Sequence, residues 1–312
     1  MPARAARRSL AGASAAALLL VPALSTRPAA AQQEGTAVVT ALPKSGEVPT
    51  IPQQSIQVTV DGKQVQPTVW RPYGHDPVEL VLLIDSSARS SFGRNLEDLT
   101  KFIGSLPPNV SVGIAYMQNG NAIFTGPISK EHATVASQLH LPAGTPGSNA
   151  SPYFCLSDLA KRWPSPRSAA RREVIMITDG VDEYQRRYDP DDPYLAAAVA
   201  DSQRAGLVVY SIYYRDQGRA SGSGYETNAG QNYLNQVADE TGGRLYYEGL
   251  SNPVSFTPFF DDLSRRLNNQ YELGFPARAE KKESYPQLKI KSQIGSVKFD
   301  APKHVAVGPE GK

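Results

Sequence analysis

Two apolar runs that each end in an aspartate constrain the fold of this chain more than any other feature. The first run, residues 80–84, stops at Asp85, and the second, residues 174–177, is followed by Thr178 and Asp179. Short apolar runs bounded by turn residues are typical of strands buried on both faces of a parallel sheet. In open α/β sheets, ligands bind just beyond the carboxyl ends of such strands. The sequence therefore predicts a site near the two aspartates.

The residue types at this predicted edge suit a hard cation. Asp85 is followed by Ser86 and Ser87, and Asp179 is followed by Gly180. Carboxylate and hydroxyl oxygens are the ligands that Mg²⁺ prefers, in a nearly octahedral arrangement. Two strands that deliver these groups to one edge of a sheet could hold such an ion.

Strands and helices alternate through the middle of the chain. The expected helices cover residues 94–106, 132–139, 153–163, 193–205, 233–241 and 253–269. Further strands are expected at 110–117, 122–128, 207–214 and 245–247, with loops at 142–152 and 217–230. This alternation predicts an α/β fold class, with a doubly wound, mostly parallel sheet flanked by helices over residues 78–270.

The segments on either side of that domain have a different character. Residues 32–52 are polar with scattered Gly and Pro, which predicts a linker or a loosely held entry segment. Residues 53–77 contain two alternating runs joined by Asp61 and Gly62, which predicts a β hairpin. Residues 271–312 form a C-terminal β segment of short alternating runs. Because domain termini often lie close together, we expect the hairpin and this segment to pair as a small β appendage.

Taken together, the two strands that end in aspartate resemble the von Willebrand factor type A (VWA) domain family. Asp85 and Ser87 match the first two positions of the family's Asp-x-Ser-x-Ser motif, and Asp179 matches its later Asp-Gly pair. Arg89 stands where the second Ser of the motif belongs. Residues 271–274 resemble a Tyr-x-Leu-Gly strand found after the VWA domain in secreted VWA-related proteins of Acidobacteria. The resemblance implies a Rossmann-like, doubly wound fold.

The resemblance also implies a site of the MIDAS type, the family's metal-ion-dependent adhesion site, for Mg²⁺ or Mn²⁺. The ligands carried over from the motif are Asp85, Ser87 and Asp179. The family takes one more hydroxyl from a middle loop. Ser151 is the leading candidate for it, and Thr145 and Ser148 are weaker ones. In this family the ion keeps an open position for an acidic group of a partner.

Arg89 leaves two interpretations of this site open, because a guanidinium has no lone pair to offer a metal. In the first, Arg89 points to solvent and Ser90 or Ser91 supplies the missing hydroxyl. In the second, its guanidinium bridges Asp85 and Asp179 in place of the cation. The candidate partner-binding residues at this edge are Arg89, Ser90 and Asp182.

The first 31 residues predict a secretory signal peptide. Arg4, Arg7 and Arg8 precede an Ala/Leu-rich run, and three alanines follow that end at Ala31. Signal peptides share this order of basic, apolar and small residues. The apolar run is too short and too rich in Ala for a membrane-spanning helix. We therefore expect cleavage after Ala31 and a secreted or periplasmic protein without a transmembrane helix.

Removal of that segment changes the charge balance of the chain. It holds four Arg and no acidic residue, so 28 basic residues remain against 30 acidic ones. The formal net charge thus changes from +2 to −2. Without a basic excess or a tract of Lys and Arg, nucleic acid is excluded as a partner.

The few residues with catalytic or soft-metal chemistry are scattered. Cys155 is the only cysteine, so no intrachain disulfide can form, and the four His residues show no metal-ligand spacing. No His accompanies the carboxylates, which argues against a metal-dependent hydrolase. The sequence favours a non-enzymatic binding or adhesion-type protein that contacts a protein or cell-envelope ligand. The alternative is a structural or assembly module in which Arg89 replaces the cation.

Overall fold

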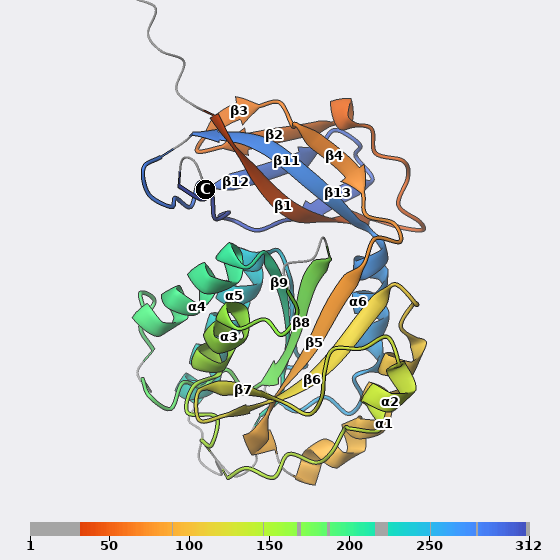
Figure 1. Ribbon diagram of the computed structural model, residues 1–312, viewed down its shortest axis with the longest axis vertical. Helices are drawn as coiled ribbons and strands as arrows, with labels where there is room; N and C mark the ends of the chain where they lie inside the picture. Colours follow the sequence, from red (N-terminus) through yellow and green to blue (C-terminus); the bar gives the residue numbers. More distant parts are fainter. Residues whose placement is uncertain are drawn as a thin grey trace, which may run out of the picture. The chain divides into compact units, whose positions relative to one another are not determined.

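A six-stranded sheet forms the centre of the larger module in the computed structural model (Figure 1). Its strands are β5 (Val78–Asp85), β6 (Val110–Gln118), β7 (Asn121–Phe124), β8 (Arg171–Thr178), β9 (Leu207–Tyr213) and β10 (Leu245–Tyr246). They lie in the order β7-β6-β5-β8-β9-β10, and every neighbouring pair is parallel except β6 and β7. Counted along the chain, this is the 3-2-1-4-5-6 order of doubly wound folds. The predicted fold class is confirmed.

The structure describes residues 32–88, 90–145, 147–166, 170–185, 188–215, 224–249, 251–278 and 280–309. The predicted signal peptide and Arg89 lie outside these ranges. Within the described ranges, no helix combines the length and the apolar character that a membrane crossing requires.

The central strand β5 shows why the apolar runs fold as predicted. Side chains of a strand point alternately to the two faces of its sheet. Leu80, Leu82 and Ile84 join the hydrophobic cluster on one face, and Val81 and Leu83 join the cluster on the other. Since both faces are covered, every residue of the run is fully buried.

Helices cover both faces of the sheet (Figure 1). One face carries α1 (Leu96–Ser105), α2 (His132–Ala136) and α6 (Thr257–Asn268), and the other carries α3 (Pro152–Lys161), α4 (Pro193–Arg204) and α5 (Gly224–Thr241). Two helices have clear start signals. Ser151 caps α3 and Asp192 caps α4, each with a proline at the first helical position. Short 3₁₀ helices are η1 (Gln53–Ser55), η2 (Ser86–Ala88) and η3 (Ser90–Asn95).

The remaining strands form a second module, here called the β module, from both ends of the described chain. Its strands are β1 (Gln32–Pro43), β2 (Ile56–Val60), β3 (Lys63–Val65), β4 (Val69–Pro72), β11 (Gln270–Arg278), β12 (Leu288–Ser292) and β13 (Val297–Asp300). They make two sheets, β13-β1-β11-β4 and β12-β2-β3, that share one hydrophobic cluster. The strands β2 and β3 pair through Asp61 and Gly62, which both have positive φ as a tight hairpin turn requires.

Two sequence predictions are wrong, one in the β module and one at the start of α5. The expected linker over 32–52 includes the long strand β1, which pairs on both sides. Its inward face consists largely of small residues, Ala37, Val39 and Ala41, so its alternation is inconspicuous in the sequence. The expected loop at 217–230 is helical from Gly224 onward, and residues 217–223 lie outside the described ranges. Packing of Tyr233 and Leu234 against the sheet outweighs the weak helix propensity of the first turns of α5.

Candidate functional site

The carboxyl ends of β5 and β8 lie side by side where the strand order of the sheet reverses. The register pairs Ile84 with Ile177, so Asp85 lies beside Thr178. This position between the two central strands is the topological switch point, where ligands of doubly wound folds bind. We call it the switch-point edge and define it as residues 85–88, 147–151 and 178–182.

Asp85 is the centre of this edge. Its side chain is buried, with the residue 2% exposed, and both carboxylate oxygens accept hydrogen bonds. One oxygen accepts from the backbone N–H of Ser87 at 2.9 Å and from the Ser87 hydroxyl at 2.6 Å. The other accepts from the Asn149 side-chain amide and the Thr178 hydroxyl, each at 2.7 Å. Four protein donors therefore occupy the lone-pair sites of one carboxylate.

This arrangement leaves oxygen lone pairs directed away from Asp85. A hydroxyl that donates its proton keeps two acceptor sites. The Ser87 hydroxyl keeps both, and the Thr178 hydroxyl keeps one because it also accepts the N–H of Gly180 at 3.3 Å. The side-chain carbonyl of Asn149 is buried and has no hydrogen-bond partner. Hydroxyl, amide and carboxylate oxygens of this kind fit Mg²⁺ or Mn²⁺.

Asp179 follows Thr178 and is also buried. Its carboxylate accepts the backbone N–H of Val181 at 3.0 Å. The chain then turns sharply at Gly180, whose φ is +70° and where an added Cβ would lie 2.6 Å from the carbonyl oxygen of Gly230. Only glycine satisfies both conditions, so the backbone itself requires the glycine of the Asp-Gly pair.

Ser151 and Asp182 form a second cluster on this edge. The Ser151 hydroxyl donates to Asp182 at 2.8 Å, and it accepts the N–H of Tyr153 as the cap of α3. The other oxygen of Asp182 accepts the N–H groups of Tyr184 and Gln185. Burial raises the pKa of the Asp182 carboxyl, and the Ser151 hydrogen bond opposes that rise. The structure thus joins Ser151 to Asp182, whereas the middle-loop residue that reaches Asp85 is Asn149.

The middle loop explains why Asn149 could not be identified from the sequence. Gly147 and Ala150 have positive φ, with values of 75° and 61°. Backbone N–H groups of Asn119 and Gly120 hold the loop by donating to the carbonyls of Ser148 and Asn149. This irregular path aims the Asn149 side chain at Asp85, and no periodic pattern encodes it. The Ser148 hydroxyl is buried without a hydrogen-bond partner, and Thr145 is exposed.

The remaining expected site residues are Arg89 and Ser90. Arg89 lies outside the described residues, and the backbone of Ser90 starts the short helix η3. Within the described ranges, no group of three or more His, Cys, Asp or Glu side chains is placed to hold a metal. A cation at the switch-point edge would therefore depend on hydroxyl and amide oxygens in addition to the aspartates.

Three aromatic rings pack together next to the Asp182 cluster. Phe154, Tyr184 and Tyr194 contact one another edge to face, with centroids 4.9–5.8 Å apart. Tyr184 is 68% exposed although it lies in this group. The Asp182 carboxylate accepts the backbone N–H of Tyr184, which holds the backbone that carries this ring. These three residues are far apart in the sequence, so no local sequence pattern predicted this surface.

Comparisons with known proteins add similarities of fold. No protein-family model matches the chain, and no curated protein matches it. Among solved structures, it is similar to an aerotolerance-related membrane protein from Bacteroides fragilis, with 16% identity and a TM-score of 0.41 over 61% of this chain and 98% of the other. BatB from Bacteroides thetaiotaomicron gives 15% identity, a TM-score of 0.40 and coverage of 61% and 97%. The SpRpn10 VWA domain gives 13% identity, a TM-score of 0.35 and coverage of 57% and 97%. Likeness at this level concerns chain arrangement and carries no information about ligands.

Proposed function

We propose that this chain is a non-enzymatic binding protein of the VWA type that holds Mg²⁺ or Mn²⁺ at the switch-point edge. An acidic group on a protein or cell-envelope partner would complete the coordination of the ion. The N-terminal segment that ends at Ala31 directs the protein to a secreted or periplasmic location.

The observation that carries this proposal is the convergence of oxygen donors around Asp85. The hydroxyls of Ser87 and Thr178 both donate to this one carboxylate, so their oxygens lie near the same point. The buried carbonyl of Asn149 belongs to a side chain that also contacts Asp85, and it lacks a hydrogen-bond partner. An unpaired buried carbonyl costs about 1–3 kcal/mol, and a cation at this point would remove that cost. Asp179 adds a second carboxylate at the end of the adjacent strand.

The partner surface extends from this edge to the exposed ring of Tyr184. Tyrosine and phenylalanine are enriched in protein interfaces, because they offer large contact areas with little loss of side-chain entropy. Asp182 connects the two parts, since it binds Ser151 on one side and supports Tyr184 on the other.

The same residues support a role without catalysis. Hydrolysis at a metal site needs a general base or an activated water near the ion. No His belongs to the segments that build the switch-point edge, at 85–88, 147–151 and 178–182. We expect no turnover in a screen of hydrolase substrates with and without Mg²⁺.

The test is isothermal titration of Mg²⁺ and Mn²⁺ into the purified protein and two serine variants. Ser87→Ala removes a proposed ligand, and we expect it to weaken binding by about tenfold or more. Ser151→Ala removes another buried hydroxyl at the same edge and should leave the affinity for metal unchanged, apart from a loss of about 1 kcal/mol of stability from the helix cap. Circular dichroism at the temperature of the titration checks that each variant is folded.

Two results would oppose the proposal. If the unaltered protein shows no saturable heat with either ion at millimolar concentration, the metal site is absent. If the two serine variants lose affinity equally, the ion binds elsewhere on the edge.

A metal-free structural or assembly module is the second candidate, and one observation favours it. The four donors to Asp85 already satisfy its carboxylate. In that case the edge is a fixed hydrogen-bonded junction, with Arg89 as the replacement for the cation. Substitution Arg89→Ser would then create divalent binding that the unaltered protein lacks.

A further inference from the structure

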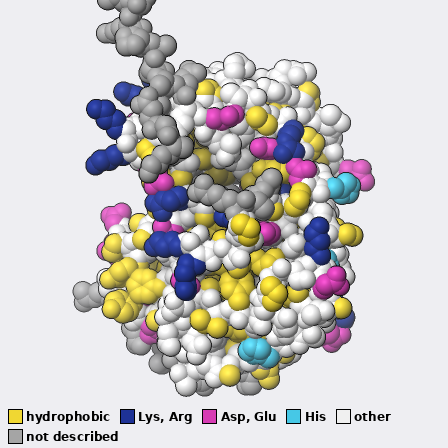
Figure 2. Space-filling view, viewed as in Figure 1, with side chains coloured by type: hydrophobic (Ala, Val, Ile, Leu, Met, Phe, Trp, Pro, Cys, Tyr) yellow, Lys and Arg dark blue, Asp and Glu magenta, His cyan; other side chains and the backbone are white. Residues whose placement is uncertain are grey.

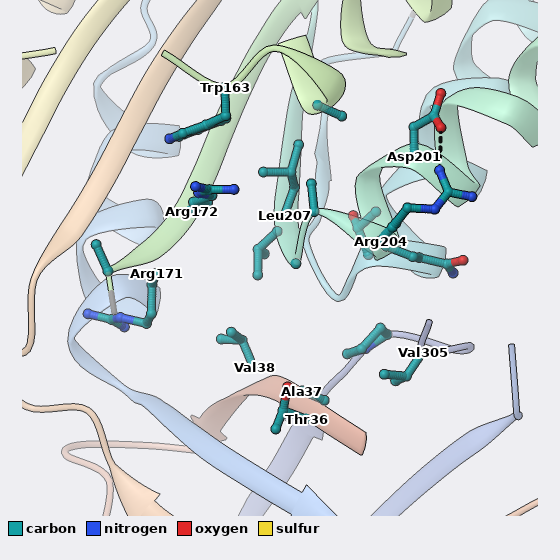
Figure 3. A pocket seen from close by; sticks show the side chains of 18 of the residues that line it. Thr36, Ala37, Val38, Trp163, Arg171, Arg172, Asp201, Arg204, Leu207 and Val305 are labelled. Atoms are coloured by element: carbon teal, nitrogen blue, oxygen red, sulfur yellow. Dashed lines mark hydrogen bonds and ion pairs between the residues drawn. The ribbon is translucent and has the colours of Figure 1, made fainter. Parts of the chain in front are cut away.

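A second candidate site lies at the opposite edge of the sheet from Asp85. The register pairs Val78 with Arg171, so the starts of β5 and β8 lie side by side at the edge opposite the switch-point edge. There, between the sheet and the β module, is a cavity of about 750 Å³ (Figure 3). Its walls come from β1, the starts of β8 and β9, the ends of α3 and α4, and the segment after β13. We call it the junction cavity.

The lining of the junction cavity combines apolar walls with positive charge. The apolar side chains include Val38, Trp163, Leu207 and Val305. Among the described lining residues, the permanent cations are Lys161, Arg171, Arg172 and Arg204, and the carboxylates are Asp201 and Glu272. Pockets for small molecules have volumes of about 300–1,000 Å³, mostly apolar walls and a few polar groups, and often lie between domains. The junction cavity has this volume and this position, and polar and apolar groups share its walls about equally.

The cationic groups are positioned by contacts within the protein. Arg172 lies over the ring of Trp163, 5.3 Å from its centroid. Arg204 and Lys161 both bind Asp201, at 2.6 Å and 2.8 Å. Figure 3 shows Arg172 and Arg204 on different sides of the cavity, with Trp163 above Arg172. Figure 2 shows that Lys and Arg side chains also gather on the outer surface over α3 and α4.

Arg171 lines the cavity from a largely buried position. The residue is only 5% exposed, and its terminal nitrogen donates to the carbonyl of Leu267 and the side chain of Gln270. Its Nε–H is buried without a hydrogen-bond partner.

We propose that the junction cavity binds an amphipathic organic anion, with a carboxylate or phosphate head beside Arg172 and an apolar body against Val38, Leu207 and Val305. The assignment of the head rests on the position of Arg172 at the apolar wall formed by Trp163. A cationic ligand is disfavoured because the described lining residues carry four permanent cations against two carboxylates. This proposal is independent of the metal site, since it concerns the other edge of the sheet.

The two tryptophans of the chain allow a direct test. Trp163 lines the cavity, whereas Trp70 is in the β module and stacks on Tyr271 with centroids 4.6 Å apart. The variant Trp70→Phe therefore leaves Trp163 as the single fluorescent reporter. We would titrate it with sodium octanoate, octyl phosphate and the neutral 1-octanol. Either anion is expected to change the emission saturably, at concentrations at least about tenfold below those needed for octanol. Comparison of the two anions identifies the preferred head group.

A matched pair of arginine variants locates the head group. Arg172→Gln in the Trp70→Phe background should weaken binding of the preferred anion by about tenfold and leave octanol unaffected. Arg162→Gln removes the same charge at the end of α3, from a residue that does not line the cavity, and should change neither affinity. Calorimetric titration of the unaltered chain with the same three compounds measures binding without the Trp70 substitution.

Three outcomes would overturn the proposal. Absence of saturable binding in both fluorescence and calorimetry would show that the cavity takes no such ligand. Equal affinity for octanol and the anions would show a purely apolar pocket. Equal losses in Arg172→Gln and Arg162→Gln would show attraction to the general surface charge. None of these results bears on Mg²⁺ binding, so the two proposals fail separately.

Discussion

Glu173 in β8 provides a sharp prediction about stability. It is 0% exposed, and neither of its carboxylate oxygens has a hydrogen-bond partner. Burial raises the pKa of this carboxyl from 4.5 to about 7, although the positive charge of Arg171 and the nearby side-chain amide of Gln270 oppose the rise. The folded protein therefore keeps a proton on Glu173 at pH values where the unfolded chain has lost it. In that window the folded state binds more protons, so the free energy of unfolding falls as the pH rises.

The magnitude follows from the same pKa values. Each pKa unit corresponds to about 1.4 kcal/mol, so the loss between pH 4.5 and 7 is roughly 3 kcal/mol, and it is complete above pH 7. Glu173→Gln keeps the shape of the neutral acid and removes the titration. We expect this variant to match the unaltered protein near pH 4 and to be more stable by roughly 3 kcal/mol at pH 8.

Urea unfolding from pH 4 to 8.5, with linear extrapolation to water, measures this difference. Glu47→Gln serves as a control because Glu47 is exposed and lies in a bend after β1. If the difference in stability between Glu173→Gln and the unaltered protein does not change between pH 5 and 8, Glu173 is ionised in the folded state and the reasoning is refuted.

Two further substitutions have expected outcomes in the same unfolding assay. Asp85→Asn places an amide among four donors, so we expect the free energy of unfolding to fall by roughly 3 kcal/mol. The variant should also lose any binding of Mg²⁺. Unchanged stability would contradict the central role of Asp85. Asp300→Ala removes one of the two carboxylates that bind the buried Arg266, and Asp262 remains bound. Because the Asp300 side chain is 39% exposed, we expect a loss of stability of roughly 2 kcal/mol, less than for a fully buried ion pair. A loss below about 0.5 kcal/mol would show that this link between α6 and β13 contributes little.

The parts of the fold that follow from local pattern could be predicted from the sequence. The runs that became β5 and β8 are continuous and apolar because both faces of the sheet are covered. Asp85 ends the first strand, and Asp179 directly follows the second. The strand β1 escaped detection because its buried face is small, with Ala37 and Ala41 beside Val39. Its strand character depends on partners far away in the chain, which a local pattern does not contain.

The candidate site was predictable only where it follows the strands. The contact of Asp85 with Ser87 is local, and the contact with Thr178 follows from adjacent parallel strands. Asn149 reaches Asp85 through a loop with residues of positive φ, so its position depends on backbone geometry that composition does not specify. Ser151 was correctly placed before α3, but its hydroxyl is used by the cap and by Asp182.

The pairing of β1 has a consequence for how the chain reaches its final form. In register, Gln32 lies opposite Arg278, and Thr40 lies opposite both Gln270 and Asp300. The strand β1 therefore cannot pair with β11 and β13 until nearly all of the sequence has been synthesised. Contacts between distant residues form late, because closing long loops is entropically costly. During that interval β1 presents unpaired backbone groups on both edges, so this stage of biogenesis is the one most exposed to mispairing with other chains.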